Sequence, residues 1–241
     1  MNQHTYEKMV EMRMPGMAQA YQGQSLIDDM MQLSFDERLE LLVDAEFDNR
    51  HRNKITRLTK KAQLSEANAQ LEDIQYFTDR GLNREVFLRL ADNRYIREPK
   101  NLILTGATGS GKSYIACALG NHACQTSYRV RYIRVPDLLS EIALAKAQGT
   151  YSKILKQYQT CELLILDEWL LVPASELAQQ ELFEIIERRY RFHATIFCSQ
   201  FDTEGWHSRL GGGVLADSIL DRVLPKSLHI HIEGQESMRM R

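Results

Sequence analysis

The most informative motif of the sequence is Gly106-Ala107-Thr108-Gly109-Ser110-Gly111-Lys112-Ser113. It fits the phosphate-binding loop pattern, in which glycines let backbone N–H groups turn inward toward phosphate oxygens. An apolar run precedes it and a helical run follows it, which is the context that the motif requires. We therefore predict that this whole loop binds ATP, with Lys112 on the β and γ phosphates and Ser113 on Mg²⁺. The alternative is a glycine turn that binds nothing.

Short apolar runs alternate with longer helical stretches on both sides of this loop. The runs are residues 102–104, 130–135, 163–166, 194–198 and 228–232. Such alternation is typical of a parallel sheet whose strands are joined by crossover helices. The sequence therefore predicts an α/β fold for this part of the chain.

Two carboxylates, Asp167 and Glu168, directly follow the third apolar run. At the end of a buried strand, Asp167 would hold Mg²⁺, and Glu168 would polarise a water for attack on the γ-phosphate, which indicates hydrolysis. The segment between Lys112 and Asp167 has room for one strand flanked by helices, so we expect an additional strand between the two site-bearing strands. In the alternative reading, both acids merely cap the next helix.

The fourth apolar run changes abruptly into Ser199 and Gln200. These residues should lie at the carboxyl edge of the sheet, where open α/β folds bind their ligands. The Gln200 amide could orient the attacking water there, or Gln200 could simply begin a loop.

The first 97 residues show helical patterns and no strand pattern. Ser34 and Glu37 form a capping box, and an apolar helical stripe follows it. The stripe consists of Phe35, Leu39, Leu42 and Val43. With joints at Gly81 and the Glu98-Pro99 step, we predict a small all-α N-terminal domain at 1–80, a linker helix at 81–98 and an ATPase domain at 99–241.

The net charge of −2 predicts no global attraction to nucleic acid, but the charges are unevenly distributed. Residues 28–48 are strongly acidic, whereas residues 49–65 contain bases and no acid. On a helix, Arg50, Lys54, Arg57 and Lys61 form one stripe that can follow a duplex phosphate backbone. The stripe contains no aromatic residue, which argues against base stacking on single strands. Alternatively, the stripe pairs with the acidic segment of the same or a neighbouring subunit.

The remaining composition excludes several classes of protein. With 44% hydrophobic and 26% charged residues, the chain is neither collagen-like nor disordered. The cysteines, Cys117, Cys124, Cys161 and Cys198, form no C-x-x-C pair, which disfavours a zinc site. The longest uncharged run, 113–128, is too short for a membrane span, and charges near the N-terminus disfavour a signal peptide. We expect a cytoplasmic protein without a membrane partner.

Beyond these motifs, the chain resembles the IstB family, the ATPase helpers of two-gene insertion-sequence transposons. It resembles the DnaC helicase loaders more distantly, and both families are AAA+ proteins. The helical N-terminal block and residues 206–222 make the resemblance specific. The matching stretches are Met14-Pro15-Gly16-Met17, 33–39, 71–74, 101–106, Asp167-Glu168, Ser199-Gln200, Trp206-His207, 215–222 and 234–237.

The resemblance implies a sensor residue at Gln200 and an arginine finger at Arg222 that serves the ATP of a neighbouring subunit. A local pair with Asp221 is the alternative role for Arg222. Too few residues follow Arg222 for the helical AAA+ lid, so a lid-less domain is expected, in which Arg239 or Arg241 could partly replace a lid-borne arginine.

The implied function is a DNA- and assembly-stimulated ATPase of transposition. It would form a ring or helical homo-oligomer with shared ATP sites on duplex DNA, and deliver target DNA to the transposase of the same element. The alternatives are a helicase loader acting on single-stranded DNA and a replicative helicase, a nucleotide kinase, and a scaffold that binds ATP without turnover.

Overall fold

The computed structural model describes residues 2–24, 26, 30, 32–234 and 237–238. Asp28 and Asp29 of the acidic segment, and Arg239 and Arg241 near the C-terminus, lie outside the described residues. The chain divides into two compact units, Met1–Arg57 and Leu58–Arg241.

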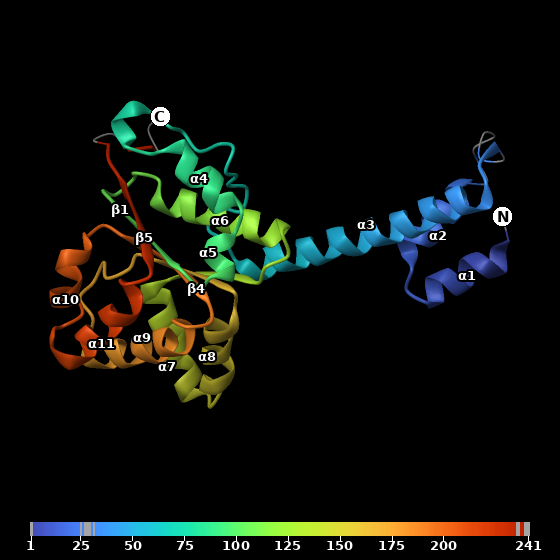
Figure 1. Ribbon diagram of the computed structural model, residues 1–241. Helices are drawn as coiled ribbons and strands as arrows, with labels where there is room; N and C mark the ends of the chain where they lie inside the picture. The colour runs from blue at the N-terminus through green and yellow to red at the C-terminus, as the bar shows by residue number, and fades with distance from the viewer. Residues whose placement is uncertain (1, 25, 27–29, 31, 235–236, 239–241) are drawn as a thin grey trace. The chain divides into compact units, whose positions relative to one another are not determined.

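The first unit is helical, as predicted. It contains α1 (Gln3–Glu11), α2 (Pro15–Gln24) and most of α3 (Phe35–Ala62), whose last turn belongs to the second unit (Figure 1). The capping box of α3 is confirmed, because the Ser34 N–H donates to Glu37 Oε2 at 2.7 Å and the Glu37 N–H donates to Ser34 Oγ at 3.3 Å. The apolar stripe after it is only partly buried: Leu42 is buried, whereas Phe35, Leu39 and Val43 are exposed.

The second unit is built on a five-stranded parallel sheet. Its strands are β1 (Asn101–Gly106), β2 (Val130–Arg134), β3 (Leu163–Asp167), β4 (Ala194–Ser199) and β5 (Ser227–Ile232), in the order β2-β3-β4-β1-β5. All five apolar runs of the sequence are therefore strands. The additional strand is confirmed as well, since β2 separates β1 and β3 along the chain and β4 separates them in the sheet.

Helices cover both faces of this sheet (Figure 1). One face carries α6 (Lys112–Gln125), α4 (Arg84–Ala91) and α5 (Arg94–Arg97), and the other carries α7 (Val135–Ala147), α8 (Tyr151–Thr160), α9 (Glu176–Arg189), α10 (Trp206–Arg209) and α11 (Gly213–Val223). Along β1, Leu102 and Leu104 point into the first layer and Ile103 into the second, because successive strand residues alternate between faces. The unbroken apolar runs are thus explained by burial on both sides.

The compact units divide the chain at a different place from the expected domain boundaries. The expected linker helix at 81–98 is two helices, α4 and α5, whose Phe87, Leu90, Tyr95 and Ile96 are buried in the same core as α6. Residues 58–80, including the short helix η2 (Thr78–Arg80), also contribute buried side chains to this core. The second unit therefore begins at Leu58, because apolar side chains before residue 99 are needed to cover the sheet.

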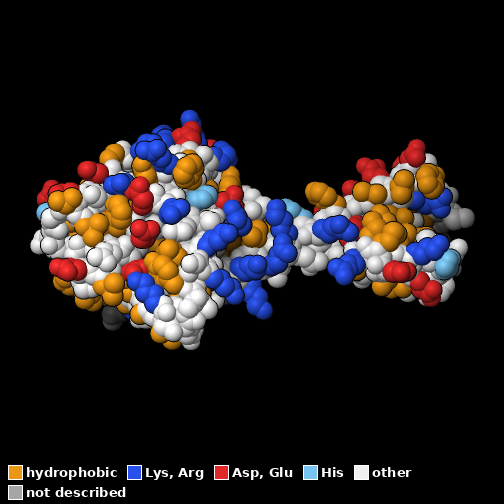
Figure 2. All heavy atoms as spheres, turned by 90° about the horizontal axis from the view of Figure 1, so that it is seen from below, with side chains coloured by type: hydrophobic (Ala, Val, Ile, Leu, Met, Phe, Trp, Pro, Cys, Tyr) orange, Lys and Arg blue, Asp and Glu red, His pale blue; other side chains and the backbone are white. Residues whose placement is uncertain are grey.

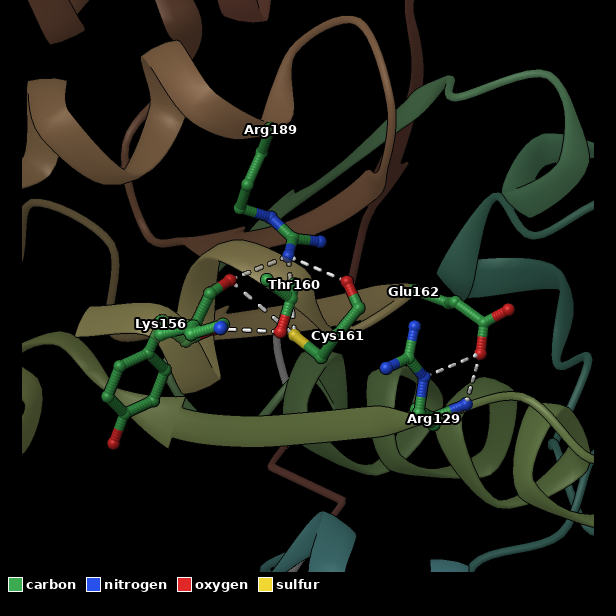
Figure 3. A network of polar contacts seen from close by, with 7 residues as sticks. Arg129, Lys156, Thr160, Cys161, Glu162 and Arg189 are labelled. Carbon is green, nitrogen blue, oxygen red and sulfur yellow. Dashed lines mark hydrogen bonds and ion pairs between the residues drawn. The ribbon is translucent and has the colours of Figure 1, made fainter. Parts of the chain in front are cut away.

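A buried arginine connects α9 to the end of α8 and to the sheet, and Figure 3 shows its contacts around Cys161. Arg189, at the end of α9, is 1% exposed, and its guanidinium donates to the carbonyls of Tyr158, Cys161 and Ala194 and to Thr195 Oγ1. These acceptors lie at the end of α8 and at the starts of β3 and β4. Neutral carbonyl oxygens stabilise the buried cation here, partly through the negative C-terminal end of α8.

Candidate nucleotide site

The phosphate-binding loop connects β1, which ends at Gly106, to α6, which begins at Lys112. Gly109 and Gly111 have φ values of +81° and +94°, which side chains of L-residues rarely adopt. A Cβ atom would also lie 2.4 Å from Ser237 Oγ at Gly109 and 2.8 Å from Arg80 Nη2 at Gly111. The backbone conformation therefore favours glycine at both positions, and the close approach of Ser237 adds to this at Gly109.

Lys112 is buried at the first position of α6. Its Nζ donates to the carbonyl oxygens of Gly106 at 2.8 Å and Ala107 at 2.7 Å, within the loop itself. Burial lowers the pKa of Lys112, and the nearby Asp167 acts in the opposite direction. The ammonium group is thus held where phosphate oxygens could replace the loop carbonyls as acceptors.

Asp167 lies at the end of β3 and is 5% exposed. Tyr132 of β2 donates its hydroxyl to Asp167 Oδ2 at 2.7 Å, and the Glu168 N–H donates to Oδ1 at 2.8 Å. Burial, together with the acceptor Asp167, raises the pKa of Tyr132, so its hydroxyl remains a donor. These contacts orient the Asp167 carboxylate.

The donors suit Mg²⁺ rather than a metal with an all-protein ligand set. Among the described residues, no group of three or more His, Cys, Asp or Glu side chains could hold a metal ion. A carboxylate from Asp167 and a hydroxyl from Ser113 are hard oxygen ligands, and Mg²⁺ commonly completes its shell with phosphates and waters. The residues therefore fit the predicted ion.

Glu168 has a φ of +54°, which turns the chain sharply after β3. Its Oε2 lies 2.8 Å from Arg134 Nη2, at the end of β2, and this ion pair raises the pKa of Arg134. The acids do not cap the following helix, because α9 begins at Glu176 and Ser175 caps it. In this structure the carboxylate of Glu168 is therefore bound to an arginine.

Gln200 directly follows β4 and is exposed. Because β4 lies between β1 and β3, Gln200 stands at the sheet edge between the phosphate loop and the acidic pair. Its neighbour Ser199 is buried and donates to the Trp169 carbonyl at 3.0 Å. The position suits a residue that contacts a γ-phosphate or its water.

Arg222 lies on α11, which packs against α9 on the sheet face opposite α6. Its guanidinium forms an ion pair with Glu187 and lies over the rings of Phe183 at 5.0 Å and Tyr190 at 5.4 Å. The partner is thus Glu187 of α9 and not Asp221, the neighbour considered as an alternative. The structure does not bring Arg222 to the phosphate loop of its own chain.

A cavity of about 520 Å³ opens beside the phosphate loop. Its lining combines loop residues with a wall from the preceding segment: Glu66, Asp73, Ile74, Gln75, Arg80, Gly109, Gly111, Lys112, Ser113, Tyr114, Ile115 and Met238. Arg80 is buried and donates to the Ser110 carbonyl at 2.7 Å. This hydrogen bond holds the backbone of the phosphate loop. The sequence analysis did not predict that these residues line a binding site. The available signal was residues 71–74, which are one of the stretches that resemble the IstB family.

The comparisons with known proteins agree with this geometry. The family model for IstB-like ATP binding proteins matches residues 7–241. This chain belongs to the IstB-like ATP binding protein family. An insertion-sequence ATP-binding protein of Sinorhizobium fredii is 38% identical over 235 residues, which cover 98% of this chain and 95% of the relative. The ATP-binding protein of IS1162 from Pseudomonas fluorescens is 40% identical over 200 residues, which cover 83% and 87%.

Solved structures confirm the P-loop AAA+ fold of this IstB-family chain. The DnaC helicase loader matches with a TM-score of 0.57 at 19% identity, over 69% of this chain and 97% of that one. AMPPCP-bound DnaA from Aquifex aeolicus matches with a TM-score of 0.57 at 20% identity, over 71% and 52%. At these identities the likeness concerns the fold alone.

The predicted basic stripe lies on α3 of the IstB-family chain, with Arg50, Lys54 and Arg57 in the first unit and Lys61 in the second. All four side chains belong to exposed residues. Arg50 is already engaged, since its Nε lies 2.7 Å from Glu46 Oε1 and its Nη2 donates to the Arg13 carbonyl at 3.2 Å. Arg50 therefore pairs with a residue of the acidic segment in its own chain, which is the alternative role considered for the stripe.

The cysteines are free and buried, as expected for small core side chains. None of the described helices combines the length and hydrophobicity needed to span a bilayer.

Proposed function

We propose that this IstB-family protein hydrolyses ATP, assembles on duplex DNA and delivers target DNA to the transposase of the same element. The observation that carries the proposal is the pairing, at one sheet edge, of a phosphate loop with the oriented carboxylate Asp167 and the adjacent Glu168. The names of the relatives, ATP-binding proteins of insertion sequences, support the assignment to transposition.

In this proposal, the residues of the second unit have the following catalytic roles. The loop N–H groups and Lys112 bind the phosphates, and Ser113 and Asp167 hold Mg²⁺, which neutralises phosphate charge when bound. Glu168 accepts a proton from the attacking water after leaving Arg134, and Gln200 orients that water. Arg222 leaves Glu187 to reach the ATP of a neighbouring subunit, so that each active site is shared between two copies.

The four stripe residues of α3 bind the phosphates of duplex DNA in this proposal. Replacing Arg50, Lys54, Arg57 and Lys61 by Ala should weaken binding to every duplex sequence alike and flatten the slope of log affinity against log salt by about 0.9 per lost contact. We expect Arg50 to contribute least, because it already pairs with Glu46. Titrations at several salt concentrations measure the slope.

A control variant removes two exposed bases elsewhere, Lys153 and Lys156 of α8. This control variant should change the slope of log affinity against log salt by less than about 0.9, the value expected for one lost phosphate contact. If the stripe variant keeps the wild-type slope but fails to self-assemble, the stripe is a protein interface, and DNA must bind elsewhere.

The ATPase rate per protomer tests the function as a whole. We expect it to rise with protein concentration, as a shared site requires, and to be stimulated by duplex DNA more than by single strands. Stimulation by single strands alone would favour the helicase-loader alternative. Binding of ATP without turnover under every condition would leave only a nucleotide-binding scaffold.

A further inference from the structure

Arg80 is a buried cation beside the phosphate loop. Figure 2 shows many Lys and Arg side chains at the surface, where water solvates their charge. Arg80 is instead only 4% exposed, at the end of η2. Its guanidinium donates to two backbone carbonyls, that of Ser110 in the loop at 2.7 Å and that of Gln75 in the segment before it. Burying a charge is costly unless it is hydrogen-bonded, so these two bonds indicate what Arg80 does there.

Met238 holds the neighbouring carbonyl of the loop. Its N–H donates to the Gly109 carbonyl at 2.9 Å. Ser237 also lies against the loop, since a Cβ atom built on Gly109 would be 2.4 Å from the Ser237 Oγ. Both Met238 and Arg80 line the cavity beside the loop. Two consecutive carbonyls are therefore held by segments that are far apart in the sequence, one before β1 and one after β5.

Holding a carbonyl also fixes the direction of the next N–H group. In a planar trans peptide, the C=O and the following N–H point in opposite directions. The bond from Arg80 to the Ser110 carbonyl therefore turns the Gly111 N–H away from Arg80. The Ser110 N–H shares a peptide group with the Gly109 carbonyl, and it donates to the Ala107 carbonyl at 3.2 Å within the loop. The contacts from outside thus orient two successive peptide groups of the loop.

The glycines of the loop make this support necessary. Gly109 and Gly111 have positive φ values, but glycine adopts either sign of φ at similar cost, so their peptide groups can rotate easily. Phosphate binding needs several N–H groups that converge on the oxygens, and a site that is ordered beforehand loses less conformational entropy on binding. We propose that Arg80 and Met238 are positioning residues of the ATP site, which hold the Ser110 and Gly109 carbonyls so that the loop is set for phosphate before ATP arrives.

This role for Arg80 and Met238 rests on the proposed function, since it takes the loop to bind ATP. It concerns two residues outside the loop motif and requires no second subunit. Inorganic triphosphate is the probe, because it has no base or ribose and can engage the loop only through phosphate oxygens. Isothermal titration calorimetry of the full-length protein measures its affinity.

Two substitutions separate the N–H of Met238 from its side chain. Met238→Pro removes the donor and should weaken triphosphate binding by about 2- to 12-fold, the usual contribution of one hydrogen bond. Met238→Ala keeps the N–H and should bind triphosphate as the wild type does. Equal losses in both variants would assign the effect to the side chain and overturn the role of the N–H.

Arg80→Lys tests the second contact while keeping the positive charge. Different guanidinium nitrogens reach the Ser110 and Gln75 carbonyls, and a compact ammonium lacks this planar fork. We expect triphosphate binding to weaken at least about threefold. Arg84→Lys is the matched control, because Arg84 is an exposed arginine at the start of α4, and it should leave the affinity unchanged.

Amide NMR spectra without nucleotide report on the loop itself. In Arg80→Lys and Met238→Pro, the Ser110 and Gly111 amide signals should broaden through exchange between peptide orientations, and triphosphate should sharpen them. In Arg84→Lys and Met238→Ala these signals should match the wild type. Thermal unfolding followed by circular dichroism checks that all four variants fold.

The outcomes for the loop and for its support are distinguishable. A wild-type protein that binds neither ATP nor triphosphate would contradict the proposed function. A wild type that binds both, with affinities and loop signals that are the same in Arg80→Lys and Met238→Pro, would overturn the positioning role alone and leave ATP binding by the loop intact.

Discussion

The proposed mechanism gives Lys112 and Glu168 separable roles, and the two side chains contact different partners. Lys112 bonds to the carbonyls of Gly106 and Ala107, so its place is among the phosphates. Glu168 lies beyond β3 and bonds to Arg134, and in the proposed mechanism it acts on the attacking water and not on the nucleotide. Binding and hydrolysis should therefore be lost by different substitutions.

Lys112→Ala should abolish ATP binding, whereas Glu168→Gln should retain it and lose hydrolysis by about 10²- to 10⁴-fold, the usual contribution of a general base. Equilibrium binding of a fluorescent ATP analogue and single-turnover hydrolysis measure the two effects. Hydrolysis by Glu168→Gln at the wild-type rate would remove Glu168 from the mechanism.

Arg134 should restrain the ATPase in the absence of DNA, because Glu168 has to leave it before accepting a proton. The Arg134 and Glu168 side chains are 47% and 28% exposed, and ion pairs this accessible contribute about 0.2–1 kcal/mol. Arg134→Ala should therefore raise the DNA-free rate by up to about fivefold, and Arg134→Lys should restore the low rate. A lower rate in both variants would show instead that Arg134 assists catalysis.

At the scale of elements, one carboxylate joins α2 to α3. The buried Glu46 accepts hydrogen bonds from the N–H groups of Gly16 at 2.8 Å and Met17 at 3.2 Å, in the first turn of α2. These donors have no partner within their own helix, so Glu46 satisfies them from α3. Burial acts to raise the pKa of Glu46, but the hydrogen bonds from Arg50, Met17 and Gly16 outweigh it and lower this pKa below 4.5.

Glu46→Gln should destabilise the packing of α2 on α3 by about 1–3 kcal/mol at neutral pH, since a charged acceptor is lost. Because the folded-state pKa is lowered, the wild-type advantage is present above pH 4.5 and disappears as the pH falls through that lower value. Hydrogen exchange of the Gly16 and Met17 amides measures it, with the exposed Glu40→Gln as control. Equal exchange in wild type and Glu46→Gln at pH 7 would contradict the role.

For the whole molecule, the proposed mechanism requires that the ATP site of one chain be completed by Arg222 of another copy. Arg222 and its helix α11 lie on one sheet face, whereas the phosphate loop leads into α6 on the other. An arginine that serves ATP from there must serve the ATP of another copy. The ion pair with Glu187 and the Phe183 and Tyr190 rings hold its side chain in the single chain.

Arg222→Ala should bind ATP normally and hydrolyse it about 10³- to 10⁵-fold more slowly, the contribution of arginine fingers in other P-loop enzymes. Mixed with the equally inactive Lys112→Ala, it should recover part of the activity, because some junctions then join an intact loop to an intact arginine. No recovery at any ratio, in mixtures shown to co-assemble, would argue against a shared site.

The sequence alone determined those features whose information lies in a short stretch of chain. Eight consecutive residues define the phosphate loop, Asp167 and Glu168 follow an apolar strand, and Ser34 and Glu37 cap α3. The five strands could also be predicted from the sequence, because a strand buried on both faces must be apolar throughout. The family assignment also rested on such stretches.

Contacts between residues that are distant in the sequence depend on the packing of the whole chain. The register of β2 on β3 places Arg134 beside Asp167, and so within reach of Glu168. Residues 58–98 pack on the sheet, so the second unit begins at Leu58 and not at the predicted boundary. The same segment contributes Ile74 and Arg80 to the wall of the cavity. The apolar stripe of α3 illustrates the physical reason: helical spacing fixes which side chains share a face, but only the positions of the other helices determine whether that face is buried, and Leu39 and Val43 are not.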